Sequence, residues 1–235
     1  MTRYTSRFQA GELLAHYIQE KDSALYATIQ NNPEKCFCFA IPNGGVPVAE
    51  GFCSTTEIDY DIIIVRKVKI PYNPEAGFGS VTPDGTILIN KPLLDNLRLS
   101  EKQKNEAIKK TKQEIQARLE TYNKSVEPKE EYRDEIEGKI VFLLDDGLAS
   151  GFTMLAAIKM VENYNPQKIY VAVPTAPHRT VNKVETRTNA TVYSPDIKKV
   201  MRFAVANAYE NWYDVPESEV KDILTHSRYY RSRIE

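Results

Sequence analysis

The strongest constraint on the fold is a short segment that has the pattern of a buried strand, a polar loop and the first turn of a helix. Apolar residues fill 141–144, two acids follow at Asp145 and Asp146, and a loop of small residues leads to Thr153. A continuous apolar run of this kind is typical of a central strand in a parallel sheet. Ligands of open parallel sheets bind where such a strand ends beside a helix start. Free amides and the helix dipole favour phosphate there.

The polar residues of this segment suit a phosphorylated sugar. The adjacent carboxylates of Asp145 and Asp146 can accept hydrogen bonds from the vicinal hydroxyls of a ribose. The residues behind them can hold a phosphate through backbone amides and hydroxyls. These residues are Ala149, Ser150, Gly151, Phe152 and Thr153. An ordinary strand-to-helix turn accounts for each feature alone, but their ordered combination favours the phosphate site.

Strands and helices are predicted to alternate along the chain. Segments typical of buried strands lie at 37–41, 61–65, 141–144, 168–173 and 190–193. Segments with a helical pattern lie at 10–29, 46–53, 100–122, 153–161, 180–188 and 218–226. This alternation predicts an α/β fold, with an open, mostly parallel and twisted sheet flanked by helices.

Three further features complete the expected architecture. Residues 79–90 are predicted to form a hairpin with a Pro-Asp-Gly turn. The polar, acidic residues at 126–137 are predicted to form a surface connection. Residues 31–194 are expected to form the core. The chain ends, 1–30 and 195–235, are expected to pack on the core as a small hood within a single structural domain.

The composition argues against several classes of protein. The 31 Lys and Arg residues nearly cancel the 32 Asp and Glu residues, so no net field favours nucleic acid or an anionic membrane as a partner. No apolar run approaches the length of a membrane span, and the polar N-terminus lacks a signal-peptide pattern. Three cysteines, an odd number without zinc-ligand spacing, fit a reducing compartment. The expected location is therefore the cytoplasm.

A second strand end carries a glycine-containing loop. Pro42-Asn43-Gly44-Gly45 follows the predicted strand at 37–41 and precedes a helical segment. The missing side chains of Gly44 and Gly45 let backbone amides approach an anion. A plain tight turn is the simpler interpretation of this segment alone.

Cations follow a third buried strand. Arg66, Lys67 and Lys69 come directly after the strand predicted at 61–65. A strand end is a poor place for charge unless solvent or an anion receives it. Arg66 can bind anion oxygens with its planar fork, and Lys67 can add a point charge.

The remaining candidates rest on position alone. His178 and Arg179 follow a strand, so they are expected near the ligand edge of the sheet. Trp212 in the C-terminal tail can stack on a flat base. The simpler alternatives are that His178 and Arg179 lie in a surface loop and that Trp212 packs on the core.

Segment 141–153 resembles the ribose-phosphate signature of type I phosphoribosyltransferases, which use phosphoribosyl pyrophosphate (PRPP). The resemblance implies that Asp145 and Asp146 hold the ribose and that residues 149–153 hold the 5′-phosphate. It further implies that residues 43–45 belong to a pyrophosphate loop, with a non-proline cis peptide bond within 42–45. Mg²⁺ is expected to bind through PRPP and water near the two acids.

The resemblance also assigns roles to the cationic segment. It implies that Arg66 and Lys67 bind pyrophosphate, with Lys69 and Glu75 as candidate catalytic or lid residues. Residues 72–80 are then expected to form a mobile lid. His178, Arg179 and Trp212 become candidate contacts of the acceptor, and a homodimer is a common assembly in this family.

One residue departs from the family pattern. Asn43 stands where relatives carry arginine, and asparagine brings no charge to the pyrophosphate. The chain resembles a subgroup whose acceptor base is not settled. The resemblance therefore implies a Mg-dependent transfer of phosphoribose from PRPP to an unidentified base. The alternative is a non-catalytic regulatory protein that binds PRPP or a nucleotide on the same fold.

Overall fold

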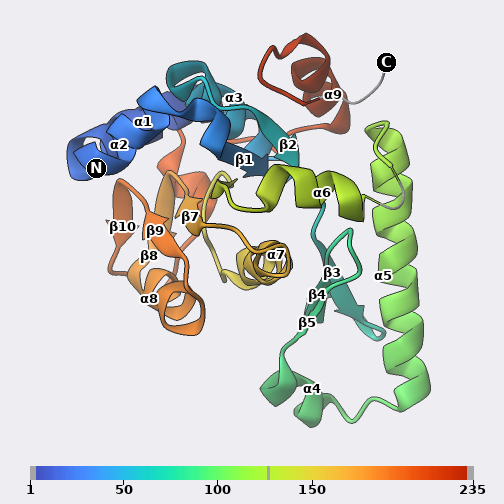
Figure 1. Ribbon diagram of the computed structural model, residues 1–235. Coiled ribbons are helices and arrows are strands. Elements are labelled where there is room, and N and C mark those ends of the chain that lie inside the picture. The colour runs from blue at the N-terminus through green and yellow to red at the C-terminus, as the bar shows by residue number, and fades with distance from the viewer. Residues whose placement is uncertain (1–3, 126–127, 232–235) are drawn as a thin grey trace.

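A five-stranded parallel sheet forms the centre of the molecule, in a computed structural model that describes residues 4–125 and 128–231 (Figure 1). The strand order is β2-β1-β6-β7-β9, and each neighbouring pair is parallel. The strands are β1 (Cys36–Ala40), β2 (Tyr60–Ile62), β6 (Ile140–Leu144), β7 (Lys168–Ala172) and β9 (Thr191–Tyr193). The predicted α/β fold with a parallel sheet is confirmed.

Side-chain alternation along the strands explains why helices cover both faces of the sheet. Cys36, Cys38 and Ala40 pack with one hydrophobic cluster, whereas Phe37 and Phe39 pack with another. Successive side chains of a strand point to opposite faces, so both faces are apolar. One face is covered by α1 (Arg7–Lys21), α2 (Ser23–Asn31) and α3 (Gly45–Thr56), and the other by α6 (Lys129–Ile136), α7 (Phe152–Glu162) and α8 (His178–Arg187).

A second, antiparallel sheet lies beside the central one. It contains β3 (Arg66–Ile70), β4 (Asn73–Val81) and β5 (Ile87–Ile89). The pairing of Ser80 with Leu88 confirms the predicted hairpin. The chain continues through α4 (Lys91–Leu97) into the long helix α5 (Glu101–Thr121), which lies along β3 at the right of Figure 1. The helix predicted over 100–122 is present, and Ser100 caps α5 in a reciprocal capping box with Gln103.

The C-terminal residues return to the N-terminal end of the chain. A short parallel pair joins β8 (Thr175–Pro177) to β10 (Asp196–Lys198). The tail then forms a bridge between Tyr209 and Tyr4 and ends in α9 (Glu217–His226). The tail therefore contacts both the N-terminal segment, at Tyr4, and strand β8.

Two sequence-based predictions were wrong. The helix predicted over 10–29 is two helices, because Asp22 ends α1 and caps α2 by accepting a hydrogen bond from the Leu25 amide. The predicted surface connection at 126–137 contains α6, which buries Tyr132 and Ile136 against the sheet. Residues 126 and 127 of that segment lie outside the described residues.

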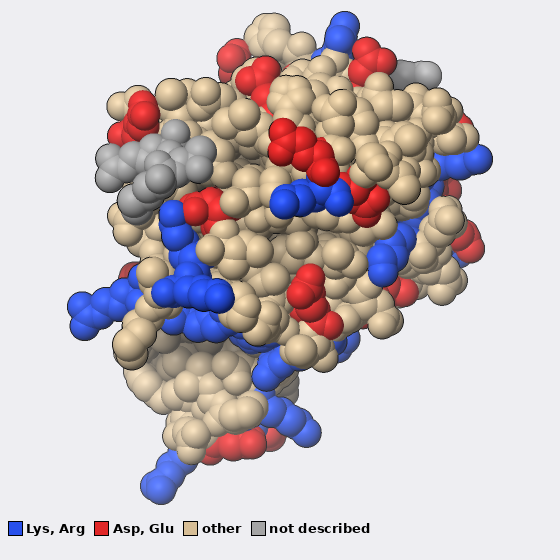
Figure 2. All heavy atoms as spheres, turned by 90° about the vertical axis from the view of Figure 1, so that its left-hand side faces the viewer, with Lys and Arg blue, Asp and Glu red and all other residues tan. Residues whose placement is uncertain are grey.

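The surface carries a hollow with Lys and Arg side chains gathered at its rim (Figure 2). A cavity of about 580 Å³ lies between the β5–α4 segment and helices α7 and α8, and its lining includes Lys91, Lys159, Lys183 and Arg187. Within residues 4–125 and 128–231, every helix is too short or too polar to cross a membrane.

Candidate functional site

The register of the central sheet brings two of the predicted loops together. Strands β1 and β6 are neighbours, and Ala40 pairs with Leu144 at their carboxyl ends. The Pro42–Gly45 loop and the Asp145–Gly151 loop therefore leave the sheet side by side. A cavity of about 320 Å³ lies at this edge, and its lining includes Asn43, Gly44 and Asp146. This is the strand-end location at which open α/β sheets bind ligands.

Both glycines of the Pro42–Gly45 loop lie too close to the end of β6 to carry a side chain. A Cβ at Gly44 would lie 2.0 Å from Oδ2 of Asp146, and one at Gly45 would lie 2.7 Å from the Leu144 carbonyl oxygen. The Pro42–Asn43 peptide bond is cis, as expected for residues 42–45. The loop backbone thus packs directly on the acid pair.

The two acids share a buried position at the end of β6. The Asp146 amide donates to Oδ1 of Asp145 at 2.8 Å. Burial raises the pKa of the Asp145 carboxyl well above its usual range, and the charge of Asp146 raises it further. Burial also raises the pKa of Asp146, against the opposing effect of the Arg7 guanidinium. Adjacent carboxylates in a low dielectric favour a ligand that donates hydrogen bonds to them.

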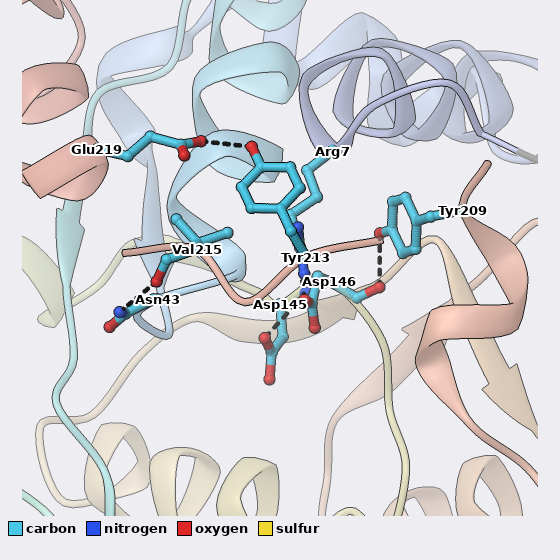
Figure 3. A network of polar contacts seen from close by, with 8 residues as sticks. All are labelled: Arg7, Asn43, Asp145, Asp146, Tyr209, Tyr213, Val215 and Glu219. Carbon is cyan, nitrogen blue, oxygen red and sulfur yellow. Dashed lines mark hydrogen bonds and ion pairs between the residues drawn. The ribbon is translucent and has the colours of Figure 1, made fainter. Parts of the chain in front are cut away.

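Arg7 is a site residue that the sequence did not reveal. Its Nε lies 2.9 Å from Oδ2 of Asp146, and its side chain is only 5% exposed. The guanidinium packs against the rings of Tyr209, Trp212 and Tyr213, with the Trp212 centroid 4.3 Å away. Figure 3 shows Arg7 extending from α1 to the acid pair. An arginine in a first helical turn is ordinarily exposed, so no local pattern marked it.

The C-terminal tail is anchored to both loops (Figure 3). The Tyr209 hydroxyl donates to the Asp146 carbonyl oxygen at 2.7 Å. Asn43 Nδ2 donates to the Val215 carbonyl oxygen at 2.7 Å. The Tyr213 hydroxyl donates to Glu219 at 2.7 Å, which fixes the ring beside Arg7. Trp212 therefore lies at this edge of the site, with 40% of its side chain exposed.

The predicted phosphate loop has amide groups available for an anion. The amides of Ala149, Ser150, Gly151 and Thr153 donate to no described residue. Its carbonyl oxygens are instead bound by α8. The Thr180 hydroxyl donates to Ala149 at 2.8 Å, and Lys183 Nζ donates to Ser150 at 2.9 Å. Phe152 begins α7 and Gly151 caps it with a left-handed φ of 72°, so the helix dipole adds to this amide cluster.

The predicted cations separate into two groups. Arg66 lines the same cavity as Asn43 and Asp146. Burial lowers the pKa of Arg66, and the nearby charge of Arg118 lowers it further. Lys67 instead donates to the Glu75 carbonyl oxygen at 2.9 Å, across the β3–β4 pair. Lys69 and Glu75 are exposed on those strands and do not line the cavity.

His178 and Arg179 are not brought into the cavity that contains the acid pair. Both residues lie at the start of α8, away from that cavity. Arg179 donates to the carbonyl oxygens of Val200 and Met201, at 3.3 and 2.6 Å. It holds the segment that follows β10. Both residues are exposed on a helix, so they do not lie in the surface loop that was the simpler alternative.

Arg118 is the second site residue that sequence reasoning missed. It belongs to α5, yet it lines the same cavity as Arg66 and Gly44. Its Nη2 donates to Oδ1 of Asn43. Its Nη1 pairs with Glu217 at 2.8 Å. The contact with Asn43 spans 75 positions of the sequence, so only the tertiary structure shows it.

Comparison with known proteins places this geometry in a family. The family model described as the phosphoribosyl transferase domain matches residues 9–207. Rv0571c and MT0597, provisionally named phosphoribosyl transferases of two Mycobacterium tuberculosis strains, are each 28% identical over 184 residues. The match covers 78% of this chain and 40% of each relative, so the chain spans about two fifths of their length.

A solved structure has the same fold over almost the full chain. The crystal structure of TT1426 from Thermus thermophilus matches with a TM-score of 0.69 and 26% identity. The match covers 94% of this chain and 97% of that one. The signature at the end of β6, the parallel sheet and the match over 9–207 agree. The chain belongs to the phosphoribosyl transferase domain family.

Proposed function

We propose that this chain transfers the 5-phosphoribosyl group of PRPP to a nucleobase-like acceptor and releases pyrophosphate. One observation carries the proposal. The Asp145–Asp146 pair lies between an amide-rich helix start at 149–153 and the glycine loop at 43–45, all at one edge of the sheet. That arrangement offers two carboxylates that can accept hydrogen bonds from sugar hydroxyls, with one anion site on each side of them. PRPP has the matching pattern, a ribose between a 5′-phosphate and a pyrophosphate.

Each part of the ligand has a matching set of residues. The ribose hydroxyls would donate to Asp145 and Asp146, replacing part of the Arg7 contact at Oδ2. The 5′-phosphate would accept hydrogen bonds from the available amides of Ala149, Ser150, Gly151 and Thr153, and from the Thr153 hydroxyl. The pyrophosphate would lie against residues 43–45 and Arg66. Lys67 would need to leave the Glu75 carbonyl oxygen to contribute its charge.

The transferase chemistry follows from where these charges lie. Breaking the bond at the sugar C1 places positive charge on the ring and negative charge on the departing pyrophosphate. Arg66 and the loop amides can stabilise the leaving group, because fixed donors aimed at developing charge lower the barrier. The acceptor would attack from the opposite face and invert C1. A movement of residues 72–80, the predicted lid, over the site would exclude water from the ring cation.

The donor groups present fit Mg²⁺ bound with its substrate. Asp145 and Asp146 offer carboxylate oxygens, and Mg²⁺ ordinarily combines one or two carboxylates with water and substrate phosphate oxygens. No cluster of three or more metal-ligating side chains lies within residues 4–125 and 128–231, so most ligands would come from PRPP and water. When bound, Mg²⁺ would neutralise charge on the pyrophosphate.

Turnover distinguishes the transferase from the regulatory alternative. The assay measures pyrophosphate released from PRPP and Mg²⁺ across a panel of purine and pyrimidine bases. The transferase assignment predicts release that depends on one base or a small group of related bases. Tight PRPP binding without release for any base would contradict it and favour the regulatory alternative.

A further inference from the structure

The glycine loop at 42–45 carries no cation of its own, and the structure places an arginine from a distant helix against its Asn43. The Arg118 guanidinium reaches from α5 and donates to Oδ1 of Asn43. The side-chain nitrogen of Asn43, Nδ2, donates to the Val215 carbonyl oxygen at 2.7 Å. Asn43 is therefore held at both ends, and its carboxamide positions the guanidinium of Arg118 beside the loop.

Two guanidinium groups face the same cavity, and one of them has no ion-pair partner among the described residues. Arg66 and Arg118 both line the cavity of about 320 Å³ that also contains Gly44 and Asp146. The charge of Arg118 is one cause of the lowered pKa of Arg66, so the two groups are close enough to repel each other. Arg66 forms no ion pair within residues 4–125 and 128–231. Neighbouring cations at a partly buried site are stabilised when an anion joins them.

Arg118 itself has unused hydrogen-bonding capacity. Its side chain is 20% exposed, and Glu217, its only ion-pair partner in the described residues, is 42% exposed. Its Nε is buried and has no hydrogen-bond partner among the described residues. A purely structural arginine would be expected to have its buried donors satisfied. The open donor, the neighbouring cation and the glycine loop point to an anion.

We propose that Arg118 supplies the positive charge that Asn43 lacks, and that it binds the pyrophosphate group of PRPP together with Arg66. The inference rests on the proposed PRPP site and adds a residue to it. A diphosphate carries several oxygens that two guanidinium forks can bind at once. Glu217 then competes with the ligand for the Nη1 side of Arg118.

The test compares two ligand fragments by titration calorimetry. The probes are pyrophosphate with Mg²⁺ and ribose 5-phosphate, each titrated into the full chain. Arg118→Gln should weaken pyrophosphate binding at least tenfold and leave ribose 5-phosphate binding within about twofold. The matched control is Arg133→Gln, because Arg133 is exposed on α6 and its nearest acid is 4.0 Å away. The control should change neither affinity.

Two further variants test whether Arg118 binds pyrophosphate through its charge or only supports the loop at 42–45. Adding Asn43→Arg to Arg118→Gln returns a guanidinium to the loop, so it should restore most of the lost pyrophosphate affinity. Glu217→Gln removes the competing acid, so it should strengthen pyrophosphate binding about twofold or more. If Arg118 only supported the loop, Glu217→Gln would leave the affinity unchanged or weaken it. This last variant keeps Arg118 and remains informative if Arg118→Gln fails to fold.

Failure of this inference is distinguishable from failure of the proposed function. Equal losses of both ligands in Arg118→Gln, or no loss of pyrophosphate, would overturn the role of Arg118 while the PRPP site stands. Absence of binding of PRPP, pyrophosphate and ribose 5-phosphate to the unmodified chain would overturn both. Selective loss of pyrophosphate with rescue by Asn43→Arg would support the inference.

Discussion

At the scale of single residues, the carboxylate of Asp146 is the most constrained group of the site. Arg7 holds its Oδ2 at 2.9 Å, and the backbone of Gly44 leaves no room for a Cβ on the same side. In the proposed PRPP complex, a ribose hydroxyl would share this carboxylate with Arg7 and lie beside the Gly44 backbone. The position of this one carboxylate links the N-terminal helix, the glycine loop and the end of β6.

Gly44→Ala tests this packing directly. Gly44 has φ −62° and ψ −30°, which alanine adopts without strain, so the added methyl acts through its contact with Asp146. Displacing that carboxylate should raise the PRPP dissociation constant at least tenfold, or about 1.4 kcal/mol. Calorimetric titration with PRPP measures the effect. Unchanged affinity would show that Asp146 does not need its present position.

Asp145→Asn should separate stability from ligand binding. Burial and Asp146 raise the pKa of the Asp145 carboxyl, so the folded chain binds that proton more tightly than the unfolded chain does. The resulting stabilisation is present below about pH 4, the ordinary carboxyl value, and is lost as the pH rises through the folded pKa.

The asparagine side chain does not titrate. As the pH rises from about 4 to neutrality, the Tm of Asp145→Asn should therefore increase relative to the Tm of the unmodified chain. PRPP affinity should fall at the same time. Thermal unfolding followed by circular dichroism across this range measures the difference. A Tm difference that is constant with pH would show that ionising Asp145 does not destabilise the folded chain.

At the scale of elements, two glycines bring α1 to the site. A Cβ at Gly11 would lie 2.1 Å from the Val48 carbonyl oxygen, and one at Gly51 would lie 2.0 Å from the Phe8 carbonyl oxygen. The helices α1 and α3 therefore touch backbone to backbone. This close packing places Arg7, the first residue of α1, beside the end of β6.

Gly11→Ala should destabilise the protein despite the higher helix propensity of alanine. The propensity gain is about 1 kcal/mol, but the new methyl meets helix backbone that cannot move as a side chain can. Overpacking of this kind costs about 1–3 kcal/mol, and the upper part of that range is expected for contact with fixed backbone, so the free energy of unfolding should fall by up to about 2 kcal/mol. Urea denaturation measures it, with Leu13→Ala as the control.

The control residue lies on the same helix with 39% of its side chain exposed. Leu13→Ala should change the free energy of unfolding by about 0.5 kcal/mol or less. A stabilising Gly11→Ala would mean that α1 can shift away from α3 without cost. In that case the position of Arg7 would not depend on this helix contact.

Elements were predictable from sequence where the signal was local. The apolar strands, the helix over 100–122 and the loops at 42–45 and 145–151 all carry their pattern within a few residues. The break at Asp22 was missed because the helical pattern continues through it, while its side chain accepts hydrogen bonds from Leu25 and from distant Tyr193.

At the scale of the whole molecule, backbone contacts join the two end segments to each other and join the C-terminal segment to the core. The Tyr4 amide donates to Ala208 and the Glu210 amide donates to Tyr4, both at 2.8 Å. Near the other end, the Arg231 amide donates to Tyr60 at 2.9 Å. Contacts of such long range have no local sequence signal, which is why Arg7 and Arg118 were missed while the acid pair was found.

This arrangement predicts that the chain ends unfold together with the core. Trp212 is the only tryptophan of the sequence, and it lies in the tail against Arg7. Its fluorescence therefore reports on the tail, while far-ultraviolet circular dichroism reports on all helices and strands. The two urea transitions should coincide, as in two-state unfolding. An earlier fluorescence transition would show that the tail is a separate unit.

The central claim is that the edge of the sheet at Asp145 and Asp146 is a PRPP site. Calorimetric titration of PRPP with Mg²⁺ into the unmodified chain and into the Asp145→Asn, Asp146→Asn double variant tests it most directly. We expect one saturable site in the unmodified chain and no measurable binding in a double variant whose circular dichroism shows that it is folded. Equal PRPP affinity in both proteins would show that this edge of the sheet does not bind PRPP.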